Sequence, residues 1–235
     1  MLPRMVTPKY DMIVPSTGKS ITYRPYVVKE EKLLLIAMES QDEKQIENAV
    51  MSIIEECVES ALDINTLTNF DVEFIFVTLR AKSVGEGIEL SPKCKHCEEI
   101  NEVKLDLDEV TVKNLEDQTD TMIKLTDDIS VELQWPTMKH RHIDLVDEAS
   151  ETETIINMMT STIGTIYSGE EIFVTSDVPK KEVKEFVESL SNEQFNQVVD
   201  VMAKAPYLSY EIKFDCKKCG ESNSIELNGL SDFFQ

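Results

Sequence analysis

The chain carries two dithiol motifs, Cys94-Lys95-His96-Cys97 and Cys216-Lys217-Lys218-Cys219, which constrain its fold more than any other feature of the sequence. Four of the five cysteines lie in these motifs. A two-residue spacer lets one tight turn present two thiolates, and a tetrahedral Zn²⁺ ion takes four of them at about 2.3 Å. The spacing therefore predicts one structural Cys₄ zinc site, with the ligands Cys94, Cys97, Cys216 and Cys219. Paired redox dithiols and two disulfides are the alternatives. Because four thiolates leave no open coordination position, we expect no chemistry at the metal.

The net charge of −22 at pH 7 limits the kinds of partner that the chain can bind. A field of this sign repels phosphate backbones, so we expect no nucleic-acid partner. It suits a protein partner with a basic surface, although solvated helix faces are the simpler explanation for most of the acidic residues.

No apolar run approaches the roughly 20 residues that span a bilayer, and the N-terminus lacks the apolar core of a signal peptide. We therefore expect no membrane partner and a reducing cytoplasmic setting, in which thiolates bind metal more readily than they form disulfides. The fifth cysteine, Cys57, lies in an apolar helical pattern and is expected to be a small buried core residue.

Hydrophobic patterning predicts an α+β fold, with a helical body, short β-hairpins and a zinc-ribbon-like module built from the two separated CxxC hairpins. We expect a single compact unit over residues 1–235. Its expected parts are an N-terminal β-hairpin at 12–26, a helical part at 29–82, a split zinc ribbon at 86–107 plus 208–228, and an intervening hairpin and helices at 108–206.

Apolar residues at helical spacing, capping residues and prolines locate the helices more closely. In the helical part, helices are predicted to begin near Lys29, near Glu43 and at Phe70. The third runs to Lys82, and its β-branched and aromatic content leaves a strand as the alternative. Within 108–206, the expected order is an irregular segment at 108–121, a hairpin at 122–133, a helix from about Ile143 towards Ile163, a turn at 167–169, and helices after Pro179 and Ser191.

The surroundings of the two dithiol motifs form an internal repeat. A constant shift of 122 positions superimposes the cysteines and also Lys95 on Lys217, Glu99 on Glu221, Asn101 on Asn223, Val103 on Ile225 and Leu105 on Leu227. Each half is predicted to be a strand, a dithiol turn and a return strand. An isolated two-stranded hairpin is marginally stable in water, so one zinc ion that joins both hairpins would stabilise each of them.

Other residues with chemical potential carry weaker signals. His140-Arg141-His142 offers two imidazoles but no ligand spacing within a settled element, so a polar surface turn is expected there. His96 is expected to face solvent and not to replace a cysteine ligand. The sequence contains no P-loop, no Gly-x-Gly-x-x-Gly run and no Gly-x-Ser-x-Gly elbow. The chain is therefore predicted not to be an enzyme.

Several stretches, in the correct order along nearly the whole chain, give it a likeness to a known family. They are Pro15-Ser16-Thr17-Gly18 with Tyr23-Arg24-Pro25, Val28-Lys29-Glu30-Glu31-Lys32-Leu33-Leu34-Leu35, Asp71-Val72-Glu73-Phe74-Ile75-Phe76 with Leu79-Arg80-Ala81-Lys82-Ser83-Val84-Gly85-Glu86, both dithiol turns, and Gly229-Leu230-Ser231-Asp232-Phe233-Phe234. With these residues the chain resembles the baseplate hub assembly proteins of T-even-type contractile-tailed bacteriophages.

The resemblance implies a non-enzymatic role in building the phage tail baseplate, at or around its central hub. We expect an assembly factor that acts by protein–protein binding, as a chaperone of a hub or tape-measure component in the host cell cytoplasm. A permanent structural subunit of the baseplate hub in the virion is the alternative. A zinc-ribbon nucleic-acid-binding regulator is a second alternative, and a zinc hydrolase is a third.

Overall fold

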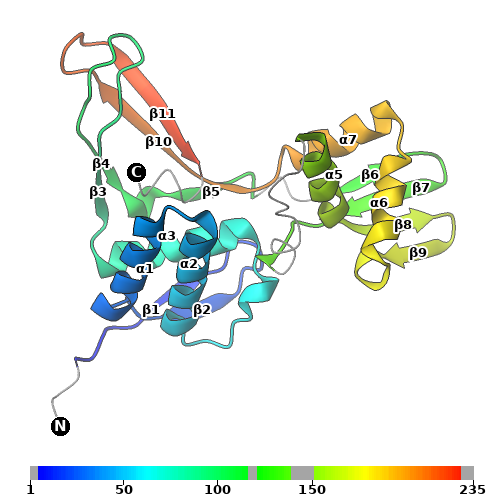
Figure 1. Ribbon diagram of the computed structural model, residues 1–235, viewed down its shortest axis with the longest axis horizontal. Coiled ribbons are helices and arrows are strands. Elements are labelled where there is room, and N and C mark those ends of the chain that lie inside the picture. The colour runs from blue at the N-terminus through cyan, green and yellow to red at the C-terminus, as the bar shows by residue number, and fades with distance from the viewer. Residues whose placement is uncertain (1–4, 116–120, 139–150, 229–235) are drawn as a thin grey trace. The chain divides into compact units, whose positions relative to one another are not determined.

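The computed structural model of the chain describes residues 5–115, 121–138 and 151–228. These residues form six α-helices and four small β-sheets, which confirms the predicted α+β class (Figure 1). Contacts between Cα atoms divide the chain into two compact units. Unit 1 comprises Met1–Ile64, Phe70–Lys113 and Tyr207–Gln235, and unit 2 comprises Asn65–Asn69 and Asn114–Pro206. That the whole chain behaves as one compact unit stays a prediction. None of the described helices is long and apolar enough to cross a membrane.

The described part of unit 1 contains three helices and strands from three sheets. They are α1 (Val28–Ser40), α2 (Glu43–Cys57), α3 (Asn69–Ser83), β1 (Tyr10–Ile13), β2 (Ser20–Tyr23), β3 (Gly87–Leu90), β4 (Val103–Asp106), β5 (Thr111–Lys113), β10 (Tyr207–Asp215) and β11 (Ser222–Asn228). The three predicted helix starts lie within one residue of the observed ones and are confirmed. At the start of α2, the Asp42 carboxylate accepts hydrogen bonds from the N–H groups of Lys44 and Gln45, as expected of an N-cap residue.

Helix α3 is buried on several sides, which explains why its sequence also fits a strand. Ile75, Phe76 and Leu79 are fully buried. An N-terminal hairpin was predicted at 12–26, and the observed β1–β2 hairpin spans Tyr10–Tyr23. It is attached to the first turn of α3. There the buried Asp71 carboxylate accepts a hydrogen bond of 2.9 Å from the N–H of Ser16 in the hairpin turn. An acidic residue at this end of a helix also interacts favourably with the helix dipole.

One apolar cluster joins α3 to the strands that lead to both dithiol motifs. Its buried members come from α3, β3, β4, β10 and β11 and from the segment after β4: Val77, Ala81, Ile88, Leu90, Leu105, Leu107, Val110, Leu208, Ile212 and Leu227. Burial alternates along β3 and, in β10, from Tyr210 to Asp215, which places the apolar side chains of these stretches on one face of each hairpin. The two hairpins therefore pack with α3 in one shared hydrophobic cluster.

Residues 108–121 were predicted to be irregular, but Thr111–Lys113 within them form strand β5. For these three residues the prediction is wrong. Strand β5 pairs antiparallel with the first residues of β10, from Tyr207↔Lys113 to Ser209↔Thr111. Three residues give too short an alternation to recognise, and the pairing joins segments more than 90 positions apart in the sequence.

The described part of unit 2 is a four-stranded antiparallel sheet with three helices. They are β6 (Met122–Lys124), β7 (Ile129–Leu133), α5 (Glu151–Thr162), β8 (Ile163–Ser168), β9 (Glu171–Val174), α6 (Lys180–Glu188) and α7 (Asn192–Met202), with the sheet order β6-β7-β8-β9. Buried side chains of all three helices pack with those of β6, β7 and β8 in one core. The β6–β7 hairpin and the helices after Pro179 and Ser191 are confirmed. Ser191 caps α7 in a capping box with Gln194.

Strands β8 and β9 are not predicted from the sequence, although a turn is predicted between them, at 167–169. A helix was predicted from about Ile143 towards Ile163; that predicted start lies outside the described residues, and the described helix α5 ends at Thr162. The β-branched residues that follow pair with both β7 and β9. Gly169 (φ +58°) provides the left-handed residue of the β8–β9 turn. An apolar run with β-branched residues next to a helix is ambiguous from periodicity alone, so only the sheet pairing decides it.

Candidate metal centre

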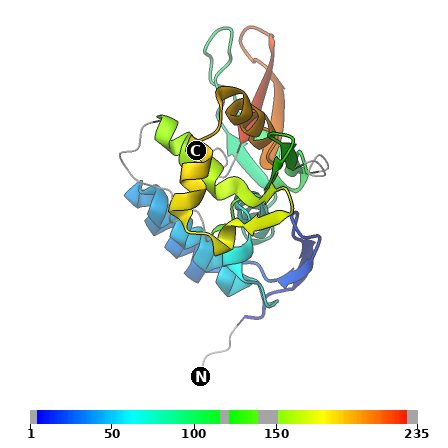
Figure 2. The ribbon, with the colours of Figure 1, turned by 90° about the vertical axis from the view of Figure 1, so that its right-hand side faces the viewer.

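Each dithiol motif lies between two antiparallel strands of unit 1. The first lies between β3 and β4, and the second between β10 and β11. In the two perpendicular views the ends of these strand pairs lie side by side (Figures 1 and 2). The motifs are thus brought together from positions 122 residues apart in the sequence.

The four cysteine sulfurs form a compact group. Cys94 Sγ lies 3.7 Å from Cys219 Sγ, and Cys97 Sγ lies 3.6 Å from Cys216 Sγ. All four sulfurs lie within 4.8 Å of one another. Four sulfurs placed at about 2.3 Å from one ion in a tetrahedron are separated by roughly 3.8 Å, close to the observed spacing. All four cysteines are free, so the two disulfides of the alternative interpretation are not formed in this structure. The group could hold a metal ion.

The two turns have the same backbone geometry. The N–H of Cys94 donates to the carbonyl of Glu99 at 2.8 Å, and the N–H of Cys216 donates to the carbonyl of Glu221 at 2.9 Å. In addition, the N–H of Glu98 donates to the carbonyl of Cys94 at 3.0 Å, and the N–H of Gly220 donates to the carbonyl of Cys216 at 2.9 Å. Both donor residues have left-handed backbone conformations, with φ of 59° at Glu98 and 74° at Gly220. The sequence repeat is therefore also a structural repeat.

Two asparagines connect the turns to each other. Asn101 Oδ1 accepts from the N–H of Lys217 at 2.9 Å, and Asn223 Oδ1 accepts from the N–H of Lys95 at 2.9 Å. Each amide nitrogen bonds a carbonyl of its own turn and also approaches a sulfur of the other. Asn101 Nδ2 lies 3.8 Å from Cys216 Sγ, and Asn223 Nδ2 lies 3.5 Å from Cys94 Sγ. The sequence analysis matched this pair in the repeat but assigned it no role.

Backbone N–H groups also point at the first cysteine of each turn. The N–H of His96 lies 3.4 Å from Cys94 Sγ, and the N–H of Lys218 lies 3.5 Å from Cys216 Sγ. The pKa of Cys216 is lowered from 9.0 to about 6, chiefly by the N–H of Cys219 and, against the effect of burial, by that of Lys218. Burial raises the pKa of Cys94, but the hydrogen bonds from His96, from Cys97 and from the Asn223 amide lower it overall. The N–H groups of Glu99 and Glu221 lower the pKa values of Cys97 and Cys219, but burial and the neighbouring sulfurs raise them overall, to about 12 for Cys219. The first cysteine of each turn therefore favours the thiolate, the form that binds metal.

Four lysines lie next to the cysteines in the sequence of an otherwise acidic chain. Lys93, Lys95, Lys217 and Lys218 are all exposed. Lys95 Nζ donates to the carbonyl of Ser224 at 2.6 Å, and Lys218 Nζ pairs with Glu99 at 2.9 Å, which holds one turn to the other. Four thiolates around a divalent cation carry a net charge of −2, so nearby lysines would offset it. Charge compensation at the metal would therefore explain why lysines flank the cysteines.

The remaining candidates from the sequence lie apart from this group. His96 is exposed, and the group of possible ligands found among the described residues does not include it. His140 and His142 lie outside the described residues. Cys57 is fully buried at the end of α2, as predicted, and burial raises the pKa of its thiol to about 11.

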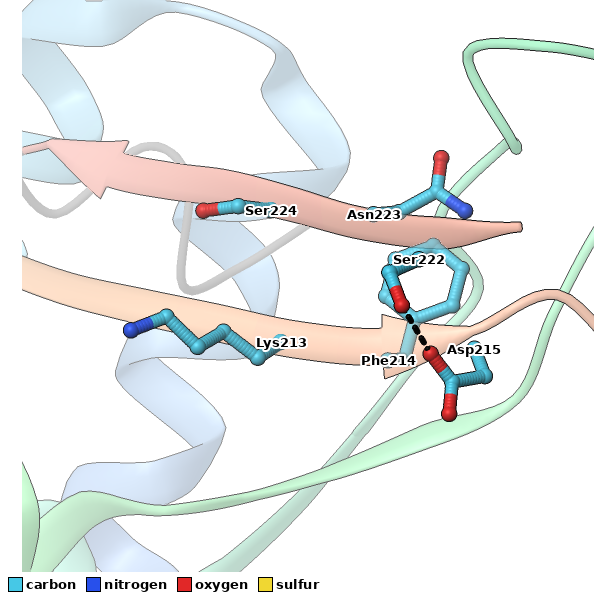
Figure 3. A pocket seen from close by; sticks show the side chains of 6 residues that line it. All are labelled: Lys213, Phe214, Asp215, Ser222, Asn223 and Ser224. Atoms are coloured by element: carbon cyan, nitrogen blue, oxygen red, sulfur yellow. Dashed lines mark hydrogen bonds between the residues drawn. The ribbon is translucent and has the colours of Figure 1, made fainter.

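An open groove of about 410 Å³ runs along the β10–β11 strands beside the second dithiol turn (Figure 3). Its lining residues are Lys213, Phe214, Asp215, Ser222, Asn223 and Ser224. Ser222 Oγ donates to Asp215 at 2.5 Å, but the six lining residues include no histidine or second carboxylate that would complete a nucleophile–base pair. The groove therefore carries no catalytic assignment.

Comparison with protein families finds one match that covers nearly the whole chain. The family described as T4 bacteriophage base plate protein matches residues 7–235. Comparison with curated proteins and with solved structures finds no significant match.

Proposed function

This chain belongs to the family of T4 bacteriophage base plate proteins, and from that premise we propose that it is a non-enzymatic assembly factor of the baseplate hub. It acts by protein–protein binding, as a chaperone of a hub or tape-measure component. The family match, which leaves only the first six residues uncovered, is the observation that carries this proposal. The closed set of four thiolates supports a structural and not a catalytic metal.

The charge of the chain favours transient binding over permanent incorporation. A net charge of −22 keeps a free protein soluble and suits encounters with basic tail components. The same charge disfavours binding to the phosphate backbones of nucleic acids. We therefore place its action in the host cell cytoplasm during assembly; a permanent hub subunit in the virion is the competing proposal.

The role of the metal in this proposal is to hold the two dithiol hairpins together as a split zinc ribbon. Thiolate ligands at tetrahedral spacing suit Zn²⁺, and we propose one ion per chain bound by Cys94, Cys97, Cys216 and Cys219. Structural zinc contributes on the order of 10 kcal/mol to the folding of small domains. Here it would stabilise the cross-turn hydrogen bonds of the two asparagines.

Quantitative proteomics of purified virions against infected-cell lysate tests the chaperone. A chaperone is abundant in the lysate and depleted from mature tails, whereas a structural subunit is present in fixed stoichiometry with other baseplate proteins. Abundance in mature tails would overturn the chaperone proposal in favour of the structural subunit. Absence of any assembly defect after deletion of the gene would overturn both.

A further inference from the structure

Strand β9 forms an open edge of the unit 2 sheet. Among the described residues it pairs only with β8 (Figure 1). All four of its residues are exposed. Three of them are large and apolar: Ile172 is 63% exposed, Phe173 41% and Val174 45%. Consecutive residues of a strand point to opposite faces, so the edge is apolar on both faces of the sheet.

The other end strands of the larger sheets each carry a charged side chain. In the three- and four-stranded sheets these are β11, β5 and β6, and they carry Glu226, Lys113 and Lys124 respectively. Charged side chains on an edge are a common device against unwanted strand addition. In β9 the only charge is Glu171, at its first position. Among these end strands of the described sheets, β9 alone has three consecutive exposed large apolar residues.

Because alternate residues of an antiparallel strand direct their N–H and C=O groups away from the neighbour, β9 presents backbone donors and acceptors to whatever lies beside it. An extended segment satisfies such a row, and a helix does not. We propose that β9 binds an extended segment of a partner protein, which adds a fifth strand to the sheet.

The side chains around β9 define the chemistry of that segment. Glu170 and Glu171 lie at one end of the strand and Asp177 lies just beyond the other, all exposed. A segment with apolar residues at its centre and lysine or arginine at both ends complements this arrangement. The inference rests on the proposed function only for the source of the segment, a basic component of the phage tail.

A second copy of the chain fits this edge less well. Pairing β9 with its own copy would bring together two chains that each carry a net charge of −22. It would also involve four residues on each side, whereas a stable interface buries about 800 Å² per partner over some 20–30 residues. A flexible segment of another protein can continue past the ends of β9 and add contacts.

The test measures the binding of a fluorescent peptide to the full-length chain by anisotropy. The probe alternates valine and threonine and carries two lysines at each end. Its first control replaces the central valine with D-valine, which has the same composition but interrupts the strand, and its second replaces the lysines with glutamates. We expect each control to bind at least about tenfold more weakly, a difference of about 1.4 kcal/mol.

Two protein variants, Ile172→Lys and Val174→Lys, should abolish binding of the probe. The matched control is Val84→Lys, because Val84 is an apolar residue of unit 1 with 57% exposure. Circular dichroism checks that each variant retains the fold of the native chain. Equal binding of the L- and D-valine peptides, insensitivity to Ile172→Lys, or no binding of the probe at millimolar concentration would each overturn the proposal.

Sedimentation equilibrium tests whether a second copy of the chain occupies the edge. A dimer of the native chain that the Ile172→Lys variant does not form would assign the edge to a second copy and overturn the proposed occupant. The peptide result is independent of the virion proteomics. If the peptide fails to bind while deletion of the gene still blocks baseplate assembly, the inference fails and the proposed function stands.

Discussion

Asn101 and Asn223 make the same pair of contacts in opposite directions across the dithiol turns. Each accepts the N–H of the lysine that follows the first cysteine of the other turn, at 2.9 Å, and each directs its amide nitrogen at that cysteine. Both asparagines are buried. The two hairpins are therefore connected by a symmetric set of hydrogen bonds as well as by the shared sulfur group.

Replacing Asn223 with alanine should weaken metal binding. The change leaves the N–H of Lys95 without its acceptor and removes a donor to Cys94 Sγ, and outer hydrogen bonds of this kind are worth about 10–100-fold in metal affinity. Competition with a chromogenic zinc chelator measures the effect. Asn101→Ala should lower the affinity by a similar factor because its contacts are equivalent. Unchanged affinity in both variants would contradict the bridging role.

Replacing Cys94 with serine should remove the zinc and destabilise the chain. With one ligand lost we expect a loss of several kcal/mol, and each 1 kcal/mol lowers the unfolding midpoint by about 2–4 °C in a domain of 150–250 residues. Elemental analysis gives the zinc content and thermal unfolding gives the midpoint. Cys57→Ala is the control, because Cys57 lies outside the sulfur group and the variant should keep about one zinc per chain.

Gly220 and Glu98 occupy equivalent left-handed positions. Adding a side chain at Gly220 and removing the side chain of Glu98 should therefore have opposite effects on the unfolding free energy. A Cβ at Gly220 meets no atom within 4 Å, so Gly220→Ala costs only backbone strain, about 1 kcal/mol of unfolding free energy. Glu98→Gly relieves the same strain and should stabilise the chain by up to about 1 kcal/mol. Denaturant unfolding of the zinc-loaded proteins measures both. Destabilisation by Glu98→Gly would show that its side chain makes a necessary contact.

The pair of Arg24 and Glu30 should make stability depend on pH. Arg24 Nη2 donates to the buried Glu30 carboxylate at 2.9 Å, as does the N–H of Val27 at 3.0 Å. Burial raises the pKa of Glu30, but these hydrogen bonds lower it overall below 4.5. The ionised form is therefore stabilised by folding. Its contribution is fully present above pH 4.5 and is lost as the pH falls through the lowered value.

Glu30→Gln should accordingly reduce the unfolding free energy by about 1–3 kcal/mol at pH 7, and the difference from the native chain should shrink below about pH 4.5. Comparing the two proteins at each pH cancels the loss of zinc that acid also causes. Glu56→Gln is the control, because the side chain of Glu56 is 58% exposed and pairs with the exposed Lys29. A difference that does not change with pH would contradict the assignment.

Elements with a strong local signal were predictable. The helix start at Glu43 follows from Asp42 as a cap, and the start of α7 follows from Ser191. Strand β5 and the run from Ile163 to Ser168 were not, since neither has a local pattern that separates strand from coil or helix. Strand pairing over long sequence separations supplies what local preference lacks.

The sequence by itself determined the metal ligands as candidates, because two CxxC turns in a chain with one other cysteine leave few ways to pair thiolates. It also determined the repeat that relates Asn101 to Asn223. Only the tertiary structure decided that these asparagines cross between the turns and that β9 leaves an apolar edge open. Both depend on which segments lie side by side. Which segments become neighbours is decided by the packing of residues far apart in the sequence, and no local pattern encodes it.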